Sequence, residues 1–173
     1  MLRMITFHSF NLTLLLTHLF TAMALSNIHV FYRFWFLWLD PIVLVATVYA
    51  LVFNPQLMLD NFVPPPLSAY NPDQGFLVHQ LAALFAFMAI VLGGVLRVSK
   101  DIQVWRVVIL GVLVVDIAML ASNYVSLKQQ DRLSLDAMRS ADWSNTLSTA
   151  FITAIRVFFL AGVGVQDTKS KKL

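Results

Sequence analysis

The sequence predicts an all-α fold, a polytopic transmembrane four-helix bundle, from three observations. Of the 173 residues, 59% are hydrophobic and 12% are charged, which is about half the charged fraction of a typical soluble domain. The mean hydropathy is +0.76. Four segments are apolar over the roughly 20 residues that a helix needs to cross a bilayer. They are residues 34–53, 76–96, 104–125 and 145–165.

The chain divides into a hydrophobic N-terminal segment (1–33), the membrane bundle (34–167) and a basic cytosolic tail (168–173). Residues 11–26 are apolar but short, and Ala22-Met23-Ala24 has the small-x-small form of a signal cleavage site. Residues 1–26 are therefore a short span, a cleaved signal or an interfacial helix. We favour an uncleaved segment, because cleavage would invert the charge pattern described next.

Lysine and arginine residues outside the spans predict the orientation. In a four-span arrangement one side carries Arg33, Arg97, Lys100, Arg106, Lys169, Lys171 and Lys172. The other side carries three basic residues beside three aspartates. The first side, with the C-terminus, is expected to be cytosolic. The tail Lys169–Leu173 resembles a dilysine retrieval signal, which predicts the endoplasmic reticulum; an ordinary basic tail is the alternative.

The two longer loops and one face of the second span have distinctive compositions. Residues 54–75 hold five of the six prolines, so we expect a poor helix beyond the first turn and an extended cover, either a lid or a spacer. The alternation of charged and apolar residues in 126–144 favours a short interfacial helix. In the second span a ridge of small residues permits close helix approach. It consists of Ala82, Ala86, Ala89 and Gly93.

The residue types that the chain lacks limit its chemistry. There is no cysteine, and all nine acidic residues are aspartate. The four histidines never fall in a paired ligand spacing, and no phosphate loop, metal-pair motif or nucleophile elbow occurs. We therefore expect no metal and no cofactor. The basic residues indicate membrane topology, so the expected surroundings are the lipid bilayer, with no nucleic acid.

Polar residues inside the predicted spans fall on one face of each helix. Ionisable groups at that depth are costly and normally face a bundle interior or a water-filled cavity. At about 100° per residue, three helices each carry one polar seam. The seams are Arg33, Asp40, Thr47 and Asn54; Asp116 and Asn123; and Asn145, Thr149, Thr153 and Arg156.

Asp116 and Arg156 are expected to meet. At a rise of ~1.5 Å per residue, both lie within ~3 Å of the centre of their spans. Those spans are antiparallel neighbours, and a lone charge at that depth would cost far more than a paired one. We predict a buried ion pair that either holds two helices together or also takes part in chemistry. Asp40, just before Pro41, is either an acid or a partial helix cap.

Further residues are candidates for the same site. His79 opens the second span near the level of Asn123 and Tyr124, where a polar mouth with Asn54 and Asn145 is expected; an interfacial position is the alternative for His79. Trp35 and Trp38 fit an aromatic belt or the lining of a cation-stabilising pocket. The candidate substrate-binding residues are Tyr124, Asn123, Trp35, Trp38 and Thr47.

The run Tyr32-Arg33-Phe34-Trp35-Phe36-Leu37-Trp38-Leu39-Asp40-Pro41, with the proline-rich loop and three more spans, resembles a family of short fungal four-span membrane proteins over residues 30–167. The size and the buried acid also resemble the small integral-membrane cyclases of fungal meroterpenoid pathways. In those enzymes a carboxyl group in the membrane is thought to protonate an epoxide or alkene of a prenyl chain. This resemblance implies terpene cyclase activity in secondary metabolism.

Two functional hypotheses follow. In the first, the chain is a cyclase or isomerase of an isoprenoid or similar apolar lipid, with Asp40 as acid and Asp116, oriented by Arg156, as stabilising anion. His79 or Tyr124 would remove the final proton. In the second, the chain is a non-catalytic scaffold or lipid-binding protein. A transporter would need two copies to enclose a path, so a homodimer is left open.

Overall fold

The computed structural model describes residues 28–67 and 70–165. These residues are helical with short connections, and the described part contains no β-strand beyond an isolated bridge between Ile28 and Val165. The all-α prediction is therefore confirmed. The alternatives for residues 1–26 and for the dilysine-like tail lie outside the described residues.

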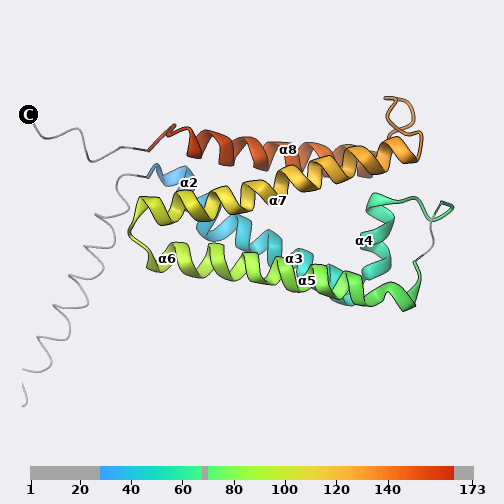
Figure 1. Ribbon diagram of the computed structural model, residues 1–173, viewed down its shortest axis with the longest axis horizontal. Coiled ribbons are helices and arrows are strands. Elements are labelled where there is room, and N and C mark those ends of the chain that lie inside the picture. Colours follow the sequence, from blue (N-terminus) through green and yellow to red (C-terminus); the bar gives the residue numbers. More distant parts are fainter. Residues whose placement is uncertain (1–27, 68–69, 166–173) are drawn as a thin grey trace, which may run out of the picture.

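Four long helical runs make up most of the described part of the chain (Figure 1). They are α2 (Val30–Phe34) with η1 (Trp35–Leu39) and α3 (Asp40–Phe53); η2 (Pro72–Gln74) with α5 (Gly75–Ile90), η3 (Val91–Val95) and α6 (Leu96–Val98); α7 (Ile102–Gln129); and α8 (Ser140–Leu160). The first three runs are long and apolar enough to cross a membrane. The 21-residue α8 covers most of the fourth predicted span but is not among those three.

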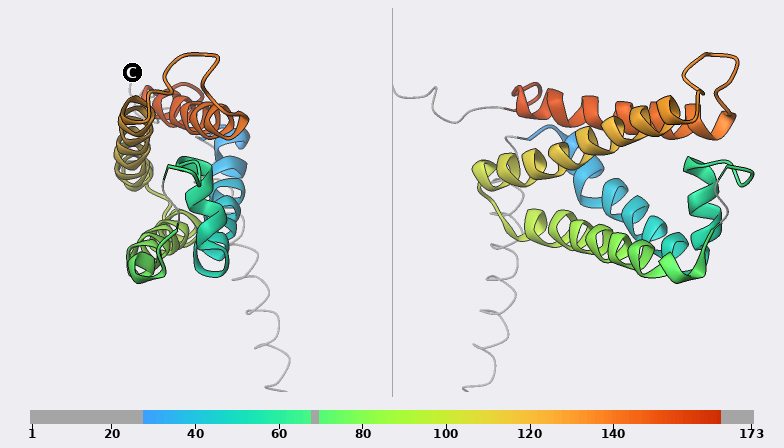
Figure 2. Two further views of the ribbon diagram at one scale, coloured as in Figure 1. Left: turned by 90° about the vertical axis from the view of Figure 1, so that its right-hand side faces the viewer. Right: turned by 45° about the vertical axis from the view of Figure 1, so that its right-hand side comes forward.

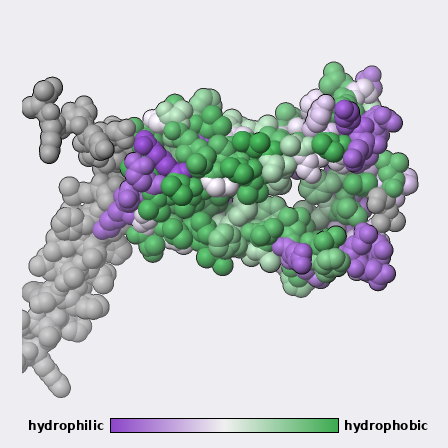
Figure 3. Space-filling view, viewed as in Figure 1, coloured by the Kyte–Doolittle hydropathy of each residue, from purple (hydrophilic) through white to green (hydrophobic). Residues whose placement is uncertain are grey.

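The helices pack as two antiparallel pairs, α3 against α5 and α7 against α8 (Figure 1). The pairs meet at the end that holds α2, α6 and the C-terminus of α8. Toward the other end they diverge, and α4 (Pro55–Phe62) stands between them there (Figure 2). We call this the α4 end. The visible surface is mostly hydrophobic along its middle, and hydrophilic residues gather toward the two ends (Figure 3).

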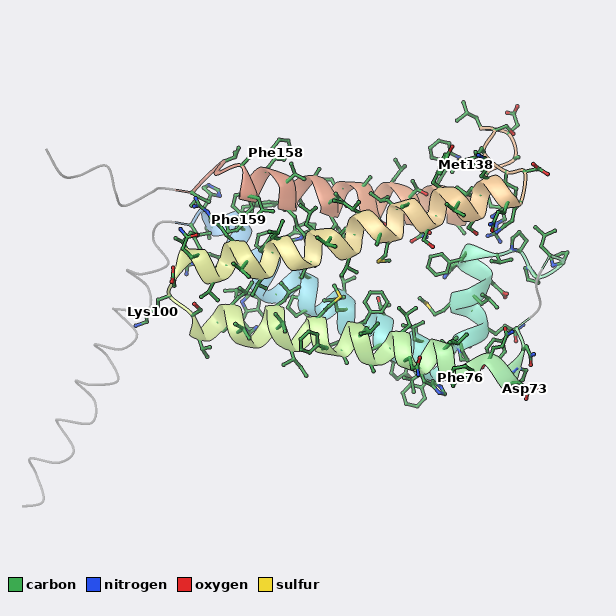
Figure 4. All side chains as sticks on the ribbon, in the orientation of Figure 1. Asp73, Phe76, Lys100, Met138, Phe158 and Phe159 are labelled. Carbon is green, nitrogen blue, oxygen red and sulfur yellow. The ribbon has the colours of Figure 1, made fainter. Side chains whose placement is uncertain are left out.

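Aromatic side chains fill the place where the two pairs meet. Phe159 of α8 is fully buried, and its ring centroid lies 5.3 Å from those of Tyr32 and Phe36 and 6.3 Å from that of Trp105. The preceding Phe158 points away from the other helices (Figure 4) and is 57% exposed. Phe36 lies about one helical turn before Asp40, and Phe159 lies about one turn after Arg156. This aromatic cluster therefore forms one boundary of the charged site described below.

The ridge of small residues on α5 and η3 faces α3. Ala82 and Ala89 are buried, together with Leu44 and Leu51 of α3. At the end of the ridge, a Cβ atom placed on Gly93 would lie 3.4 Å from the Cβ atom of Pro41, whereas one on the adjacent Gly94 would meet nothing within 4 Å. Small side chains therefore set the separation of this pair.

Gly93→Leu is expected to destabilise the protein, and Gly94→Leu is the matched control. The added side chain at position 93 has to displace Pro41, and overpacking of this kind costs about 1–3 kcal/mol. The same side chain at position 94 points into open space. Thermal unfolding in detergent should therefore give a lower midpoint for Gly93→Leu alone; equal midpoints would contradict this packing.

Both loop predictions were wrong in detail. In residues 54–75, α4 continues for two turns, because Pro55 occupies the first helical turn, where its missing N–H costs nothing. The triple proline follows only after Val63 ends the helix. In residues 126–144 there is no interfacial helix: α7 runs on to Gln129, and Asp131 then adopts φ of 52°. A residue in this left-handed region ends a helix, and aspartate tolerates it better than most.

Candidate functional site

A buried cluster of three charged side chains joins the two helix pairs. The guanidinium of Arg156 on α8 donates one hydrogen bond to Oδ2 of Asp116 on α7. Its Nη2 atom donates another to Oδ2 of Asp40 on α3, at 2.7 Å. Asp40, Asp116 and Arg156 are each less than 7% exposed. The predicted Asp116–Arg156 pair is confirmed, and Asp40 is its third member. We call these three residues the acid–arginine cluster.

A π turn places Asp40 in the cluster. In η1, the backbone N–H of Asp40 reaches back five residues to the carbonyl of Trp35. A π turn holds more residues than an α turn, so the constant rotation assumed for the Arg33–Asp40 seam does not hold across it. Asp40 also begins α3 just before Pro41. The side chain serves as an ion-pair partner of Arg156, a role that the cap alternative did not include.

The cluster contains one more carboxyl group than guanidinium. If all three groups were ionised, one negative charge would stay uncompensated among apolar helices, which is costly. Within the described residues, the Nε atom of Arg156 is buried and has no hydrogen-bond acceptor. The cluster therefore has both an excess carboxyl group and an unused donor, so it has capacity for a proton and for an oxygen atom of another molecule.

Beside the cluster, Arg97 replaces a backbone hydrogen bond that Pro41 cannot make. Because proline has no backbone N–H, it cannot donate to the Leu37 carbonyl as a regular helix would require. That carbonyl accepts a hydrogen bond of 2.8 Å from Nη2 of Arg97 on α6. The Arg97 guanidinium also lies 4.2 Å from the ring centre of Trp38, a cation–π contact. Arg97 thus completes the broken helix, a role that the sequence analysis missed.

Arg97→Met is expected to cost about 1–3 kcal/mol, because it leaves the Leu37 carbonyl without its donor. The same substitution should cost less in a Pro41→Ala background, where a backbone N–H is available again. A double-mutant cycle on thermal unfolding measures this coupling. Purely additive effects would show that Arg97 does not replace the missing backbone donor.

Most of the other predicted site residues lie away from the acid–arginine cluster, but the side chain of Trp35 interacts with the Asp40 carboxyl group. His79 is exposed on α5, about 20 Å along the helix axis from Gly93, which faces Pro41. Tyr124 and Trp38 are 55% and 53% exposed. Thr47 donates to the Val43 carbonyl of its own helix at 2.9 Å. Trp35 is half-buried and packs edge-on against Phe151.

Part of the expected polar mouth is present at the α4 end. Asn123 and Asn145 line a small hollow between α4, α7 and α8, together with Asn61, Phe62, Ser126, Leu127, Asp142 and Thr146. Asn54 and His79 are exposed and do not line it. Six of the eight lining residues are polar, so the hollow is a polar site close to the edge of the third predicted span.

Beside this hollow lies a second charged network, which the sequence analysis did not predict. Asp142 accepts hydrogen bonds from Arg132 Nη1 at 2.6 Å and from Arg139 Nη2 at 3.1 Å. Arg139 Nη1 donates to the Asp60 carbonyl at 2.9 Å, and Arg132 Nη2 donates to the Phe62 carbonyl at 3.4 Å. The two arginines therefore tie the C-terminal carbonyls of α4 to the start of α8. We call this the α4 latch.

Electrostatics favour the ionised form of Asp142, which lies outside the predicted span. Burial alone would raise its pKa. Hydrogen bonds from the side chain and backbone of Arg139, with the charges of Arg132 and Arg139, outweigh burial and hold the pKa of Asp142 below its ordinary value. The one available sequence signal was an acidic residue in the first turn of α8, where it can accept from the backbone N–H of Arg139.

Fold and site together define an all-helical protein of membrane character with a buried carboxylate–guanidinium–carboxylate cluster. The chain belongs to the family described as Domain of unknown function (DUF7704), which matches residues 12–166. No curated protein and no solved structure matches it.

Proposed function

We propose that the chain is an integral-membrane cyclase or isomerase that uses cofactor-free acid/base chemistry on an isoprenoid or other apolar, lipid-like substrate. The acid–arginine cluster is the observation that carries this proposal. It puts two carboxyl groups and one guanidinium, each less than 7% exposed, at the junction of apolar helices. A carboxyl group in such surroundings can supply a proton to a substrate that water does not reach.

The charge balance of the cluster suits an acid. One proton shared between Asp40 and Asp116 leaves one carboxylate beside one guanidinium, so that the cluster is neutral and compatible with its apolar surroundings. We assign the proton to Asp40 and the anionic role to Asp116, which Arg156 holds in place. Once Asp40 has delivered its proton, the cluster holds a second carboxylate without a matching guanidinium. This excess negative charge can stabilise a cation formed nearby.

The reaction we propose needs no co-reactant. The O–H proton of Asp40 bonds to one carbon of a substrate double bond through its π electrons, which leaves a carbocation. A second double bond attacks the cation and closes a ring, or the cation loses a proton directly. In either case the proton lost from carbon returns to the Asp40 carboxylate, so substrate and product are isomers. His79 and Tyr124 are exposed and away from the cluster, so the return to Asp40 replaces them as the base.

The cellular setting belongs to the same proposal. The dilysine-like tail and the distribution of basic residues support an endoplasmic reticulum membrane with a cytosolic C-terminus. The resemblance to small meroterpenoid cyclases supports a place in fungal secondary metabolism. The bilayer itself would deliver an apolar substrate to the helices that carry the acid–arginine cluster.

A second candidate function is a non-catalytic scaffold or lipid-binding protein. It is favoured by the position of Arg156 on α8, which contacts Asp40 on α3 and Asp116 on α7. A residue that links three helices can be retained for packing alone. In this case the cluster would hold the two pairs together and would never transfer a proton to carbon.

Deuterium incorporation distinguishes the two candidates. Membranes containing the protein are incubated in D2O with a series of prenyl substrates, with and without an epoxide, and lipid isomers are analysed by mass spectrometry. The enzyme should yield isomers carrying deuterium on carbon; Asp40→Asn should abolish them and Asp116→Asn should reduce them strongly. Asp131→Asn, at an exposed turn, is the control and should retain full activity.

Thermal unfolding of the same variants completes the comparison. Loss of deuterated product in a variant that stays folded supports catalysis. Full turnover in both Asp40→Asn and Asp116→Asn contradicts it. Loss of stability, with no deuterated isomer even from the unaltered protein, favours the scaffold.

A further inference from the structure

The polar hollow at the α4 end is small and closely defined. Asn61 comes from α4, Asn123 and Ser126 come from α7, and Asn145 and Thr146 come from α8. Its inner space matches about one water molecule. A hydroxyl group fits such a space.

One wall of the hollow offers an unused hydrogen-bond donor. The Nδ2 atom of Asn123 is buried and has no acceptor within the described part of the chain. A buried donor without a partner is costly and calls for an oxygen atom. The nearby arginines already bind Asp142 and the carbonyls of α4, so they are not free for an anion. The group that suits this site is therefore an uncharged oxygen.

The hollow and the acid–arginine cluster both involve residues of α7 and α8. Asn123 and Asp116 are seven residues apart on α7, which puts them on one face of the helix and ~10 Å apart along its axis. On α8, Thr149 lies between the hollow and Arg156 and is also buried. The helix pairs diverge between the cluster and α4 (Figure 2). A chain anchored in the hollow and extended along α7 for about 10 Å would reach the level of Asp116.

We propose that the hollow binds the hydroxyl end of an isoprenoid alcohol, with Asn123 as hydrogen-bond donor and the hydrocarbon chain directed toward Asp40 and Asp116. This assignment rests on the proposed function and specifies its substrate class: an alcohol whose reacting double bond lies ~10 Å from the oxygen atom. Asn123 is a binding residue here, and it takes no part in proton transfer.

Binding is measured on the purified full-length protein in detergent by native mass spectrometry. The probes are farnesol and farnesene, which share a prenyl chain and differ in the hydroxyl group. Asn123→Leu should weaken farnesol binding about tenfold, the value of about one neutral hydrogen bond, and leave farnesene binding unchanged. Gln129→Leu, an exposed position on the same helix that does not line the hollow, should change neither.

Equal binding of the two probes, or equal weakening of both by Asn123→Leu, overturns the assignment and leaves the hollow as a water site. If Asn123→Leu does not fold, Thr146→Ile fills the hollow while keeping the amide, and it should weaken farnesol binding selectively. Binding is independent of turnover. Selective farnesol binding without deuterated product therefore contradicts the proposed enzyme but not the site, and product with no effect of Asn123→Leu contradicts only the site.

Discussion

Arg156→Met is expected to lower the free energy of unfolding by about 3–5 kcal/mol, the cost of removing one partner from a buried ion pair. Two carboxyl groups would lose the guanidinium that both contact, and the contact between the helix pairs would lose its charged centre. Equilibrium unfolding in detergent measures the change. Lys100→Met, an exposed position in the turn between α6 and α7 (Figure 4), should have little effect.

Neutralising the carboxyl groups should restore much of that loss. In the variant that combines Arg156→Met with Asp40→Asn and Asp116→Asn, no uncompensated charge is left, and uncharged replacements of buried ion pairs often restore stability. Asp40→Asn or Asp116→Asn alone should cost less than Arg156→Met, because each leaves one carboxylate paired with Arg156. If Arg156→Met unfolds like the unaltered protein, the cluster does not join the helix pairs.

Helical phase and depth were enough to predict the central contact of the site. Asp116 and Arg156 lie in regular α-helix, where a rotation of about 100° and a rise of ~1.5 Å per residue hold over many turns. Burial of charge in an apolar chain then left pairing as the only inexpensive arrangement. The small residues of α5 were equally informative, because close packing depends on local side-chain size alone.

The third member of the cluster depended on a departure from regular geometry. Asp40 follows a π turn, and no simple periodicity crosses such a turn with a constant rotation. The row of polar residues on one helix also does not show which neighbouring helix that face contacts. For the same reason the grouping of His79 and Tyr124 with the site was not reliable: the level along a helix was predicted, but the side on which the residue lies was not.

The arginine interactions at the two ends of the bundle are made with backbone carbonyls. A pattern of side chains in the sequence does not show which carbonyls lack a partner. Arg97 completes a helix that Pro41 interrupts, and Arg132 and Arg139 bind the last carbonyls of α4. In both places the arginine was assigned to membrane orientation because its loop position was all that the sequence offered. The general expectation of basic residues near helix C-termini becomes specific only once the helices are placed.

Asp142→Leu is expected to release α4 from α8, with a destabilisation of about 3 kcal/mol. Arg132, itself 9% exposed, and Arg139 would lose the carboxylate that holds both guanidinium groups against the α4 carbonyls. Hydrogen exchange of the amides at the C-terminal end of α4 measures this release locally. Asp136→Leu, at an exposed position in the loop just before α8, should leave that exchange unchanged.

Acidification should open the α4 latch in the unaltered protein. Because the pKa of Asp142 is lower in the folded state than its ordinary value, its stabilisation is fully present above the ordinary carboxyl pKa of about 4 and is lost as pH falls through the lowered value. Protection at the end of α4, corrected for intrinsic exchange rates, should be constant from neutral pH to about 4 and then decline. In Asp142→Asn, protection should already be low at neutral pH, with no such decline below pH 4. A decline that persists in Asp142→Asn would mean that another carboxyl group controls the junction.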